Sequence, residues 1–122
     1  GLSPTSPFDI VTYKPSSSPL ENHHGILDVW AAKNIEGYKS RASHNPTIAL
    51  IKGQHDSTKQ VYREWLKEKT GKPVGGKVAW EEISPHEIFK LSEDMFDAAG
   101  VPQYARDEYY KEFNKYIYTM CK

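Results

Sequence analysis

The middle of the chain combines one compact apolar run with a helical pattern of apolar residues. Residues 47–51 form the run, which follows Asn45 and Pro46 and predicts a short strand. A helix is expected next, and three consecutive polar residues are candidates for its N-cap: Asp56, Ser57 and Thr58. The apolar positions that follow fall on one helical face: Val61, Tyr62, Trp65 and Leu66. Gly71 and Pro73 predict the end of this helix.

Two further helices are predicted in the C-terminal part. Ser84 is the expected N-cap of the first, with Pro85 at the first helical position and Glu87 completing a capping box. Gly100 closes this helix, whose apolar face is formed by Ile88, Leu91, Met95, and Phe96 or Ala99. The second helix is expected from residue 103 to about residue 120. Its inward-facing positions are Tyr109, Phe113, Tyr116 and Ile117.

The N-terminal part has weaker patterns. Residues 1–20 are rich in proline and serine and are expected to form a linker-like leader, although residues 8–13 are able to pair as a short edge strand. Residues 22–30 begin as a strand or a loop, and residues 31–41 are expected to be irregular or weakly helical. Two short strands in front of at least three helices predict a mostly helical α+β fold. The length of 122 residues fits one domain, expected at residues 21–122.

Charge is distributed unevenly, although the 16 basic and 16 acidic residues cancel. A net charge of zero argues against a generic nucleic-acid-binding protein. Residues 52–77, however, contain seven basic and three acidic side chains, and residues 81–112 contain nine acidic and three basic ones. Lys59 and Arg63 lie four residues apart on the predicted basic helix and are candidates for contacts with phosphate. A solvated helix face is the alternative interpretation of the same pattern.

Several function classes are excluded by what the sequence lacks. No run of eighteen apolar residues is present, so no membrane-spanning helix is expected. The first residues lack the basic and apolar regions of a signal peptide. Cys121 is the single cysteine, which excludes an intramolecular disulfide, is an unlikely nucleophile and fits a reducing compartment. No glycine-rich phosphate loop or Gly-X-Ser-X-Gly motif occurs.

The histidines are the candidate catalytic and metal-binding residues of this chain. His23 and His24 are adjacent, and His55 follows the predicted strand at the start of the predicted helix. Hydrolysis of a phosphodiester needs a base to deprotonate water and a cation to stabilise the phosphorane, and histidine serves as the base or as a metal ligand. Because neighbouring strand residues point to opposite faces, the two adjacent rings must have different roles. His44 is a rival for either role, and His86 is expected to be exposed.

These residues carry a resemblance to a known family. The histidine pair, Asn45, the short strand and His55 leading into a helix resemble the HNH/endonuclease VII superfamily. More closely, residues 21–24, 46–50 and 55–58 resemble the HNH-type nuclease domains found at the C-termini of bacterial polymorphic toxins. Gly1 and Leu2 also resemble the end of the motif that closes an Rhs-repeat core before its variable toxin. The resemblance covers residues 21–66 and implies a ββα-metal finger at about residues 21–70, followed by a helical extension at 80–122.

The resemblance also implies roles for individual residues. His24 would be the general base, and His23 and His55 would be ligands of one divalent metal ion. Asn45 would hold the finger together or orient His24, although a residue before proline is also a typical turn residue. Mg²⁺ is the first expectation for the metal, with Zn²⁺, Ni²⁺ and Mn²⁺ as alternatives.

Two features of the sequence depart from the family's pattern. The gap between the histidine pair and Asn45 is long, so that residues 31–43 are expected to loop out. Lys59 stands four residues after His55, where some relatives have another histidine. The remaining coordination would then come from water, phosphate, Glu21 or Asp28.

The function predicted from this resemblance is a metal-dependent endonuclease, most simply a non-specific DNase, that serves as the toxic domain of a larger secreted Rhs-type polypeptide. Its implied partners are DNA and a cognate immunity protein, with no membrane. It would be delivered as an effector and act in the cytoplasm of the target cell. Two alternatives stay open: a non-catalytic interaction domain with structural histidines, and a metal-independent RNase toxin.

Overall fold

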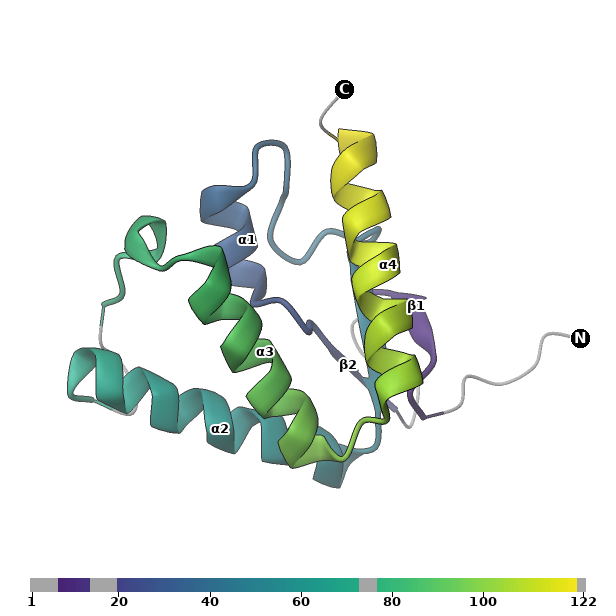
Figure 1. The fold of residues 1–122 in the computed structure, drawn as a ribbon, viewed down its shortest axis with the longest axis horizontal. Helices are drawn as coiled ribbons and strands as arrows, with labels where there is room; N and C mark the ends of the chain where they lie inside the picture. Colours follow the sequence, from purple (N-terminus) through teal and green to yellow (C-terminus); the bar gives the residue numbers. More distant parts are fainter. Residues whose placement is uncertain (1–6, 14–19, 73–76, 121–122) are drawn as a thin grey trace, which may run out of the picture.

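A small antiparallel sheet and four α-helices make up the fold (Figure 1). The computed structural model describes residues 7–13, 20–72 and 77–120. The elements follow in the order β1 (Ile10–Thr12), β2 (Glu21–His23), α1 (Asp28–Asn34), β3 (Pro46–Leu50), α2 (Lys52–Thr70), a short 3-10 helix η1 (Trp80–Glu82), α3 (Pro85–Ala99) and α4 (Gln103–Met120). The predicted α+β class, with a short-stranded sheet and mostly helical content, is confirmed.

The sheet has β3 at its centre, between β1 and β2. Both neighbours pair with β3 in antiparallel register, with Ile10 opposite Ile48 on one side and His23 opposite Ile48 on the other. All five residues of β3 are buried, as expected for the apolar run at the middle of the sequence. β1 is one of the two edge strands and lies inside the segment expected to be a linker-like leader. The described part of that segment thus pairs with the domain's sheet.

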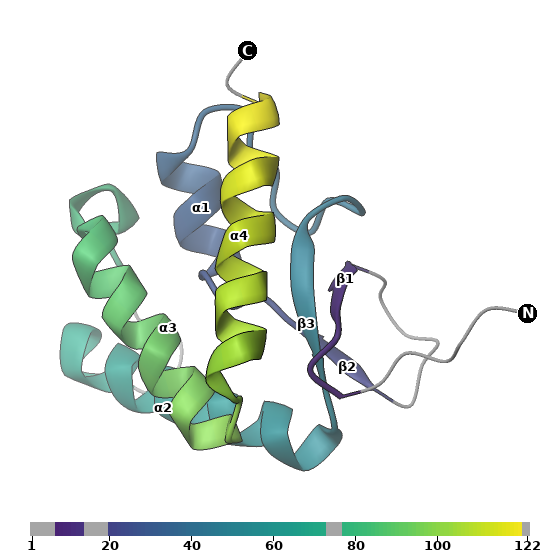
Figure 2. The ribbon, with the colours of Figure 1, turned by 45° about the vertical axis from the view of Figure 1, so that its right-hand side comes forward.

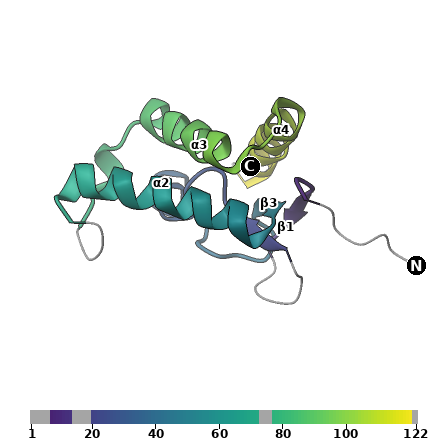
Figure 3. The ribbon, with the colours of Figure 1, turned by 90° about the horizontal axis from the view of Figure 1, so that it is seen from below.

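The helices cover the sheet from two directions. α4 stands against β3 and β1 (Figure 2), and α2 leaves directly from the end of β3 and runs alongside α3 (Figure 3). The core between them contains Ile48 and Leu50 of β3, Phe96 of α3 and Tyr109 of α4, each at most 1% exposed. The Tyr109 hydroxyl accepts a hydrogen bond of 2.9 Å from the backbone N–H of Ile26. α4 is therefore fastened to the segment that follows the histidine pair.

The two C-terminal helices form as their sequence predicts. Ser84 caps α3 through a 3.1 Å hydrogen bond from the backbone N–H of Glu87 to its hydroxyl, and Pro85 is the first helical residue. Gly100 ends α3 with a left-handed φ of 71°, a conformation in which glycine avoids a side-chain clash. Tyr109 and Phe113 of α4 are buried in the core.

The start of α2 was predicted wrongly. The helix begins at Lys52, four residues before the expected N-cap residues, and Ile51 occupies the N-cap position. The Gln54 side chain accepts a hydrogen bond of 3.2 Å from the backbone N–H of Ile51, which satisfies a backbone donor at the helix start. The strand therefore passes into the helix without a loop, and His55 lies within the first turn of α2.

The insertion between the histidine pair and Asn45 is partly helical and partly irregular, as expected for residues 31–41, but the prediction that residues 31–43 loop out was wrong. Instead of looping out, this segment begins with α1 and packs into the core through Ala31 and Tyr38, which are 0% and 5% exposed. The Trp30 indole N–H donates a 2.8 Å hydrogen bond to the Ile83 carbonyl. A helix of seven residues has too little apolar periodicity to stand out in the sequence, and its stability comes from these tertiary contacts.

Across the described ranges, no helix is both long and apolar enough to cross a membrane.

Candidate active site

A cleft of about 560 Å³ opens where β2, the start of α1, the loop before β3 and the N-terminal half of α2 meet. It gathers the three histidines singled out in the sequence, His23, His24 and His55. Their chemically relevant neighbours in the lining are Tyr13, Asp28, Ser40, Arg41, Lys59 and Tyr62. The structure thus brings together side chains that are separated by up to 49 residues of sequence.

His23 ends β2 and is 5% exposed. Its ring packs edge-on against those of His55 and Phe96, each with a centroid distance of 5.8 Å. Among the described atoms, its Nε2 is buried without a hydrogen-bond partner. Burial, together with the nearby His55 and His24, lowers the pKa of His23 to about 3. His23 is therefore a neutral imidazole at neutral pH, the form that binds a metal ion.

His55 is held by a carboxylate. Its Nδ1 lies 2.5 Å from Oε1 of Glu21, the first residue of β2. Lys59, one turn further along α2, places its Nζ 3.9 Å from the same oxygen. A carboxylate on one ring nitrogen of a histidine fixes the tautomer and orientation of the ring, and it leaves the other nitrogen free to act as a ligand.

His24 faces a second carboxylate, that of Asp28. Its Nε2 lies 3.6 Å from Asp28 Oδ1, beyond hydrogen-bond distance, and the His24 ring contacts that of Tyr13 at 5.1 Å. Burial lowers the pKa of His24, Asp28 opposes that effect, and the positive charges of Arg41 and His55 add to it. A neutral His24 beside a carboxylate is able to accept a proton, and the resulting cation would be stabilised by Asp28.

Asp28 organises the loop that precedes β3. Its carboxylate accepts hydrogen bonds from the Tyr38 hydroxyl at 3.0 Å and from the Ser40 hydroxyl. The backbone N–H of Arg41 donates to both carboxylate oxygens, at 3.2 and 3.0 Å. Asp28 was considered from the sequence as an additional metal ligand. Here it connects this loop to His24.

Asn45 lies behind the cleft and is absent from its lining. It is 0% exposed, and its side-chain amide donates to the Lys39 carbonyl at 2.9 Å and to Asp28 Oδ1 at 3.3 Å. Its Oδ1 accepts a 2.8 Å hydrogen bond from the Tyr116 hydroxyl of α4. These contacts tie together the loop, α4 and the carboxylate beside His24, so Asn45 reaches the histidine through Asp28.

Gly25 lets the chain pass beneath two aromatic rings directly after the histidine pair. A Cβ at this position would lie 2.5 Å from Tyr109 Cε2 and 2.7 Å from Phe96 Cζ, distances that real side chains do not show. Both rings are buried in the core and have little room to move. The absence of a side chain at residue 25 therefore sets how closely His24 approaches the core.

The donors for a metal ion are limited to a few side chains. In the part of the chain that the structure describes, no three His, Cys, Asp or Glu side chains are placed closely enough to hold a metal ion. The pair His23 and His55 nevertheless fits an open site, because Nε2 of His23 is buried and unpartnered and the His55 ring is oriented by Glu21. Water and a phosphate oxygen would complete such a site.

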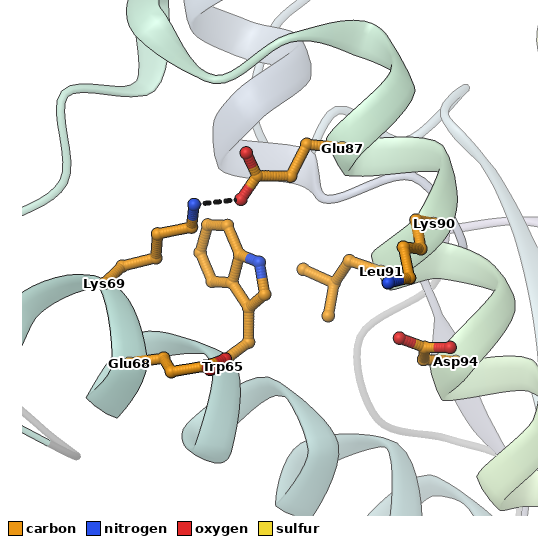
Figure 4. Close-up of a pocket in the computed structure, with 7 residues that line it drawn as sticks. All are labelled: Trp65, Glu68, Lys69, Glu87, Lys90, Leu91 and Asp94. Atoms are coloured by element: carbon orange, nitrogen blue, oxygen red, sulfur yellow. Dashed lines mark ion pairs between the residues drawn. The ribbon is translucent and has the colours of Figure 1, made fainter.

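A second pocket, of about 430 Å³, lies between α2 and α3 and differs in character (Figure 4). Lys69 forms an ion pair with Glu87 and lies 5.7 Å from the centroid of the Trp65 ring. Trp65 stacks in turn on Trp80, at 5.8 Å. No histidine lines this pocket, so we place the candidate chemistry in the histidine cleft.

The remaining candidates lie elsewhere. Lys59 lines the cleft, but Arg63 is exposed and is absent from its lining. His44 is exposed beside a groove between β1 and α4, and His86 is exposed in the first turn of α3. Arg41, Ser40 and Tyr13 were missed, because polar residues in loops give no periodic signal and only the fold brings them to the histidines.

Comparison with known proteins identifies the family. A family model described as Tox-SHH, an HNH/Endo VII superfamily toxin with a SHH signature, matches residues 17–118. The match spans most of the chain, which therefore belongs to this family of toxin domains. In one-letter code, the signature is a serine followed by two histidines, and the chain has Asn22 before its adjacent His23 and His24. No solved structure matches the chain significantly.

Proposed function

We propose that this domain is a metal-dependent endonuclease that hydrolyses the phosphodiester bonds of DNA without sequence preference. The observation that carries the proposal is the gathering of three histidines, one buried and two half-buried, with two separate carboxylates in one cleft. His55 is bound by Glu21 and packs against His23, and His24 lies beside Asp28. Membership of the HNH/Endo VII superfamily toxins supports the same reaction class.

In this mechanism, His24 is the general base. Its Nε2 is buried and faces Asp28, which favours the tautomer with the proton on Nε2 and leaves Nδ1 as the basic nitrogen. Nδ1 accepts a proton from the attacking water, and the oxygen of that water forms a bond to phosphorus. Asp28 stabilises the histidine cation that results. The bond from phosphorus to the leaving oxygen then breaks, and a solvent proton neutralises that oxygen.

His23 and His55 would hold the metal ion. Bound there, a divalent cation would supply Lewis-acid stabilisation of the negative charge that develops on the phosphate oxygens. Glu21 keeps the His55 ring in position, and burial keeps His23 neutral. Imidazole donors favour Zn²⁺ or Ni²⁺, whereas Mg²⁺ and Mn²⁺ would depend more on the water and phosphate oxygens in the remaining positions.

The biological setting belongs to the same proposal. We infer a toxic domain of a larger Rhs-type polypeptide that is delivered into a target cell and acts on DNA in its cytoplasm. Membership of a toxin family supports delivery. A cell that makes such a nuclease must be protected from it, so a cognate immunity protein is a further implied partner. The acidic surface of α3 and α4 and the basic surface of α2 are the candidate docking faces.

A plasmid-cleavage assay tests the enzymatic proposal. Purified protein should nick supercoiled DNA with Mg²⁺, Mn²⁺, Zn²⁺ or Ni²⁺, and EDTA should stop the reaction. His24→Ala should slow cleavage between about 100- and 10,000-fold, because the proton acceptor is lost. His86→Ala is the matched control, since it removes an exposed histidine outside the cleft, and it should cut at the wild-type rate.

Two results would overturn this proposal. Protein that cuts neither DNA nor RNA with any of the four metals would exclude a nuclease and favour an interaction domain with structural histidines. Cleavage of RNA that resists EDTA would indicate a metal-independent RNase. Thermal unfolding of His24→Ala must stay close to that of the wild type for its loss of cutting to be assigned to chemistry.

A further inference from the structure

Arg41 adopts a backbone conformation that is unusual for a residue with a side chain. Its φ is 58°, in the left-handed region, and it lies in the loop between α1 and β3. Steric contact of Cβ with the backbone disfavours this region for every residue except glycine. A long side chain at a position that favours glycine is the kind of strain that collects at functional sites.

Contacts with the carboxylate of Asp28 stabilise the left-handed conformation of Arg41. The backbone N–H of Arg41 donates to both oxygens of Asp28, and the neighbouring Ser40 hydroxyl donates to the same group. Asn45 and Tyr38 bind this carboxylate from the buried side. The loop is therefore folded around Asp28, and its position relative to His24 is fixed by the same residue.

The side chain of Arg41 lines the cleft and has no charged partner among the described residues. Arg41 is exposed and lines the cleft together with His24. Within the described ranges, its guanidinium forms no ion pair or hydrogen bond. The other cation of the cleft, Lys59, lies 3.9 Å from both Glu21 and Asp56, which offset its charge.

Other arginines of the chain differ on this point. Arg106 is bound to Glu93 and Asp97 between α3 and α4, at 3.6 and 2.8 Å. Arg63 is exposed on α2 and is absent from the cleft lining. Arg41 thus combines a guanidinium that pairs with none of the described residues with a place in the lining beside His24.

We propose that Arg41 binds a phosphate group of the nucleic acid strand in the cleft, next to the phosphodiester that is attacked by the water His24 deprotonates. The inference rests on the proposed nuclease function and names the residue that positions its substrate. A guanidinium presents parallel N–H donors that match two phosphate oxygens, a geometry that a lysine ammonium does not provide. The Asp28-centred loop fixes the direction from which these donors approach.

Binding measurements without cleavage test this role. The protein is His24→Ala in EDTA, and the probe is a fluorescent DNA duplex whose anisotropy is followed at several salt concentrations. Adding Arg41→Gly should weaken binding about tenfold or more and reduce the slope of log affinity against log salt by about one. Glycine suits the left-handed backbone, so the melting temperature should be maintained or raised. Arg41→Lys should restore only part of the affinity.

Arg63→Ala in the same background is the matched control. It removes one exposed positive charge outside the cleft and should weaken binding less than Arg41→Gly does. Equal binding and equal salt slopes for Arg41→Gly and its His24→Ala parent would overturn the role of Arg41, and so would an equal effect of Arg63→Ala.

The two proposals can fail separately. Cleavage by the wild-type protein, together with unchanged DNA binding by Arg41→Gly, would overturn only the phosphate contact. A wild-type protein that neither binds nor cuts nucleic acid would overturn the nuclease itself.

Discussion

The histidine cleft and the pocket between α2 and α3 are both lined by residues of α2, but their polar groups differ in whether they have partners. In the α2–α3 pocket, Lys69 is paired with Glu87 and covers the ring of Trp65 (Figure 4). In the cleft, Nε2 of His23 and Nε2 of His24 are buried without hydrogen-bond partners among the described atoms. Unpartnered buried polar atoms reduce stability, so proteins keep few of them. The N-terminal half of α2 lines the histidine cleft through His55, Lys59 and Tyr62, whereas Trp65 and Lys69 of its C-terminal half pack toward α3.

Among the substitutions at neutral pH, Gly25→Ala should disturb the histidine cleft most. Gly25→Ala should lower the free energy of unfolding by about 3 kcal/mol, because its Cβ would collide with the rings of Tyr109 and Phe96. Chemical denaturation measures this loss. The shift should also move His24 and reduce cleavage at temperatures where the variant is still folded.

Gly53→Ala is the matched control, since a Cβ there would meet nothing within 4 Å. It should be at least as stable as the wild type, because alanine favours the helix. A Gly25→Ala variant of normal stability would show that the two rings yield more easily than their burial implies.

The pH dependence of stability tests the buried His23 in the same cleft. The unfolded chain binds a proton on His23 below a pKa near 6.5, but the folded protein does so only near pH 3. The stabilising contribution of the neutral histidine is therefore complete above pH 6.5 and is lost as the pH falls toward 3. The loss from this one group should approach about 1.4 kcal/mol per pH unit in that window.

Denaturation of the wild type and of His23→Gln between pH 7 and pH 4 measures this contribution. The wild type should lose stability more steeply than the variant on acidification. His24 contributes in the same direction, because its pKa is also lowered, so the variant keeps part of the slope. Parallel curves for the two proteins would contradict the burial of a neutral His23.

The smallest effect is expected in the α2–α3 pocket. Lys69→Ala should change the free energy of unfolding by no more than about 1 kcal/mol, because the pair with Glu87 is partly exposed to solvent. DNA cleavage should stay at the wild-type rate. Loss of cleavage with normal stability would mean that this pocket also contacts the substrate, which would end the division between the two halves of α2.

Local sequence patterns predicted the elements whose starts or ends depend on nearby residues. The apolar run became β3, Ser84 and Pro85 began α3, and Gly71 and Gly100 ended their helices. These features depend on neighbours within a few residues. The start of α2 was misplaced because polar residues that commonly cap helices follow His55, while the strand leads directly into the helix at Lys52.

The candidate site was predictable only in part. The resemblance to HNH nucleases predicted that His23, His24 and His55 share one site, and the structure places all three in one cleft. The assembly around Asp28 was not predictable, because its donors lie 10 to 17 residues further along the chain and meet it only in the folded loop. The strained backbone of Arg41 likewise depends on that carboxylate and has no local signature.

The hydrogen bond between Tyr116 and Asn45 joins residues 71 positions apart and has a consequence for the order in which the domain matures. Asn45 supports the carboxylate beside His24, and its support is complete only when α4 has docked. A chain that emerges from a ribosome, or that enters a cell unfolded, would therefore hold all three histidines before their surroundings are in place. If the proposed nuclease function holds, full activity would therefore require a docked α4.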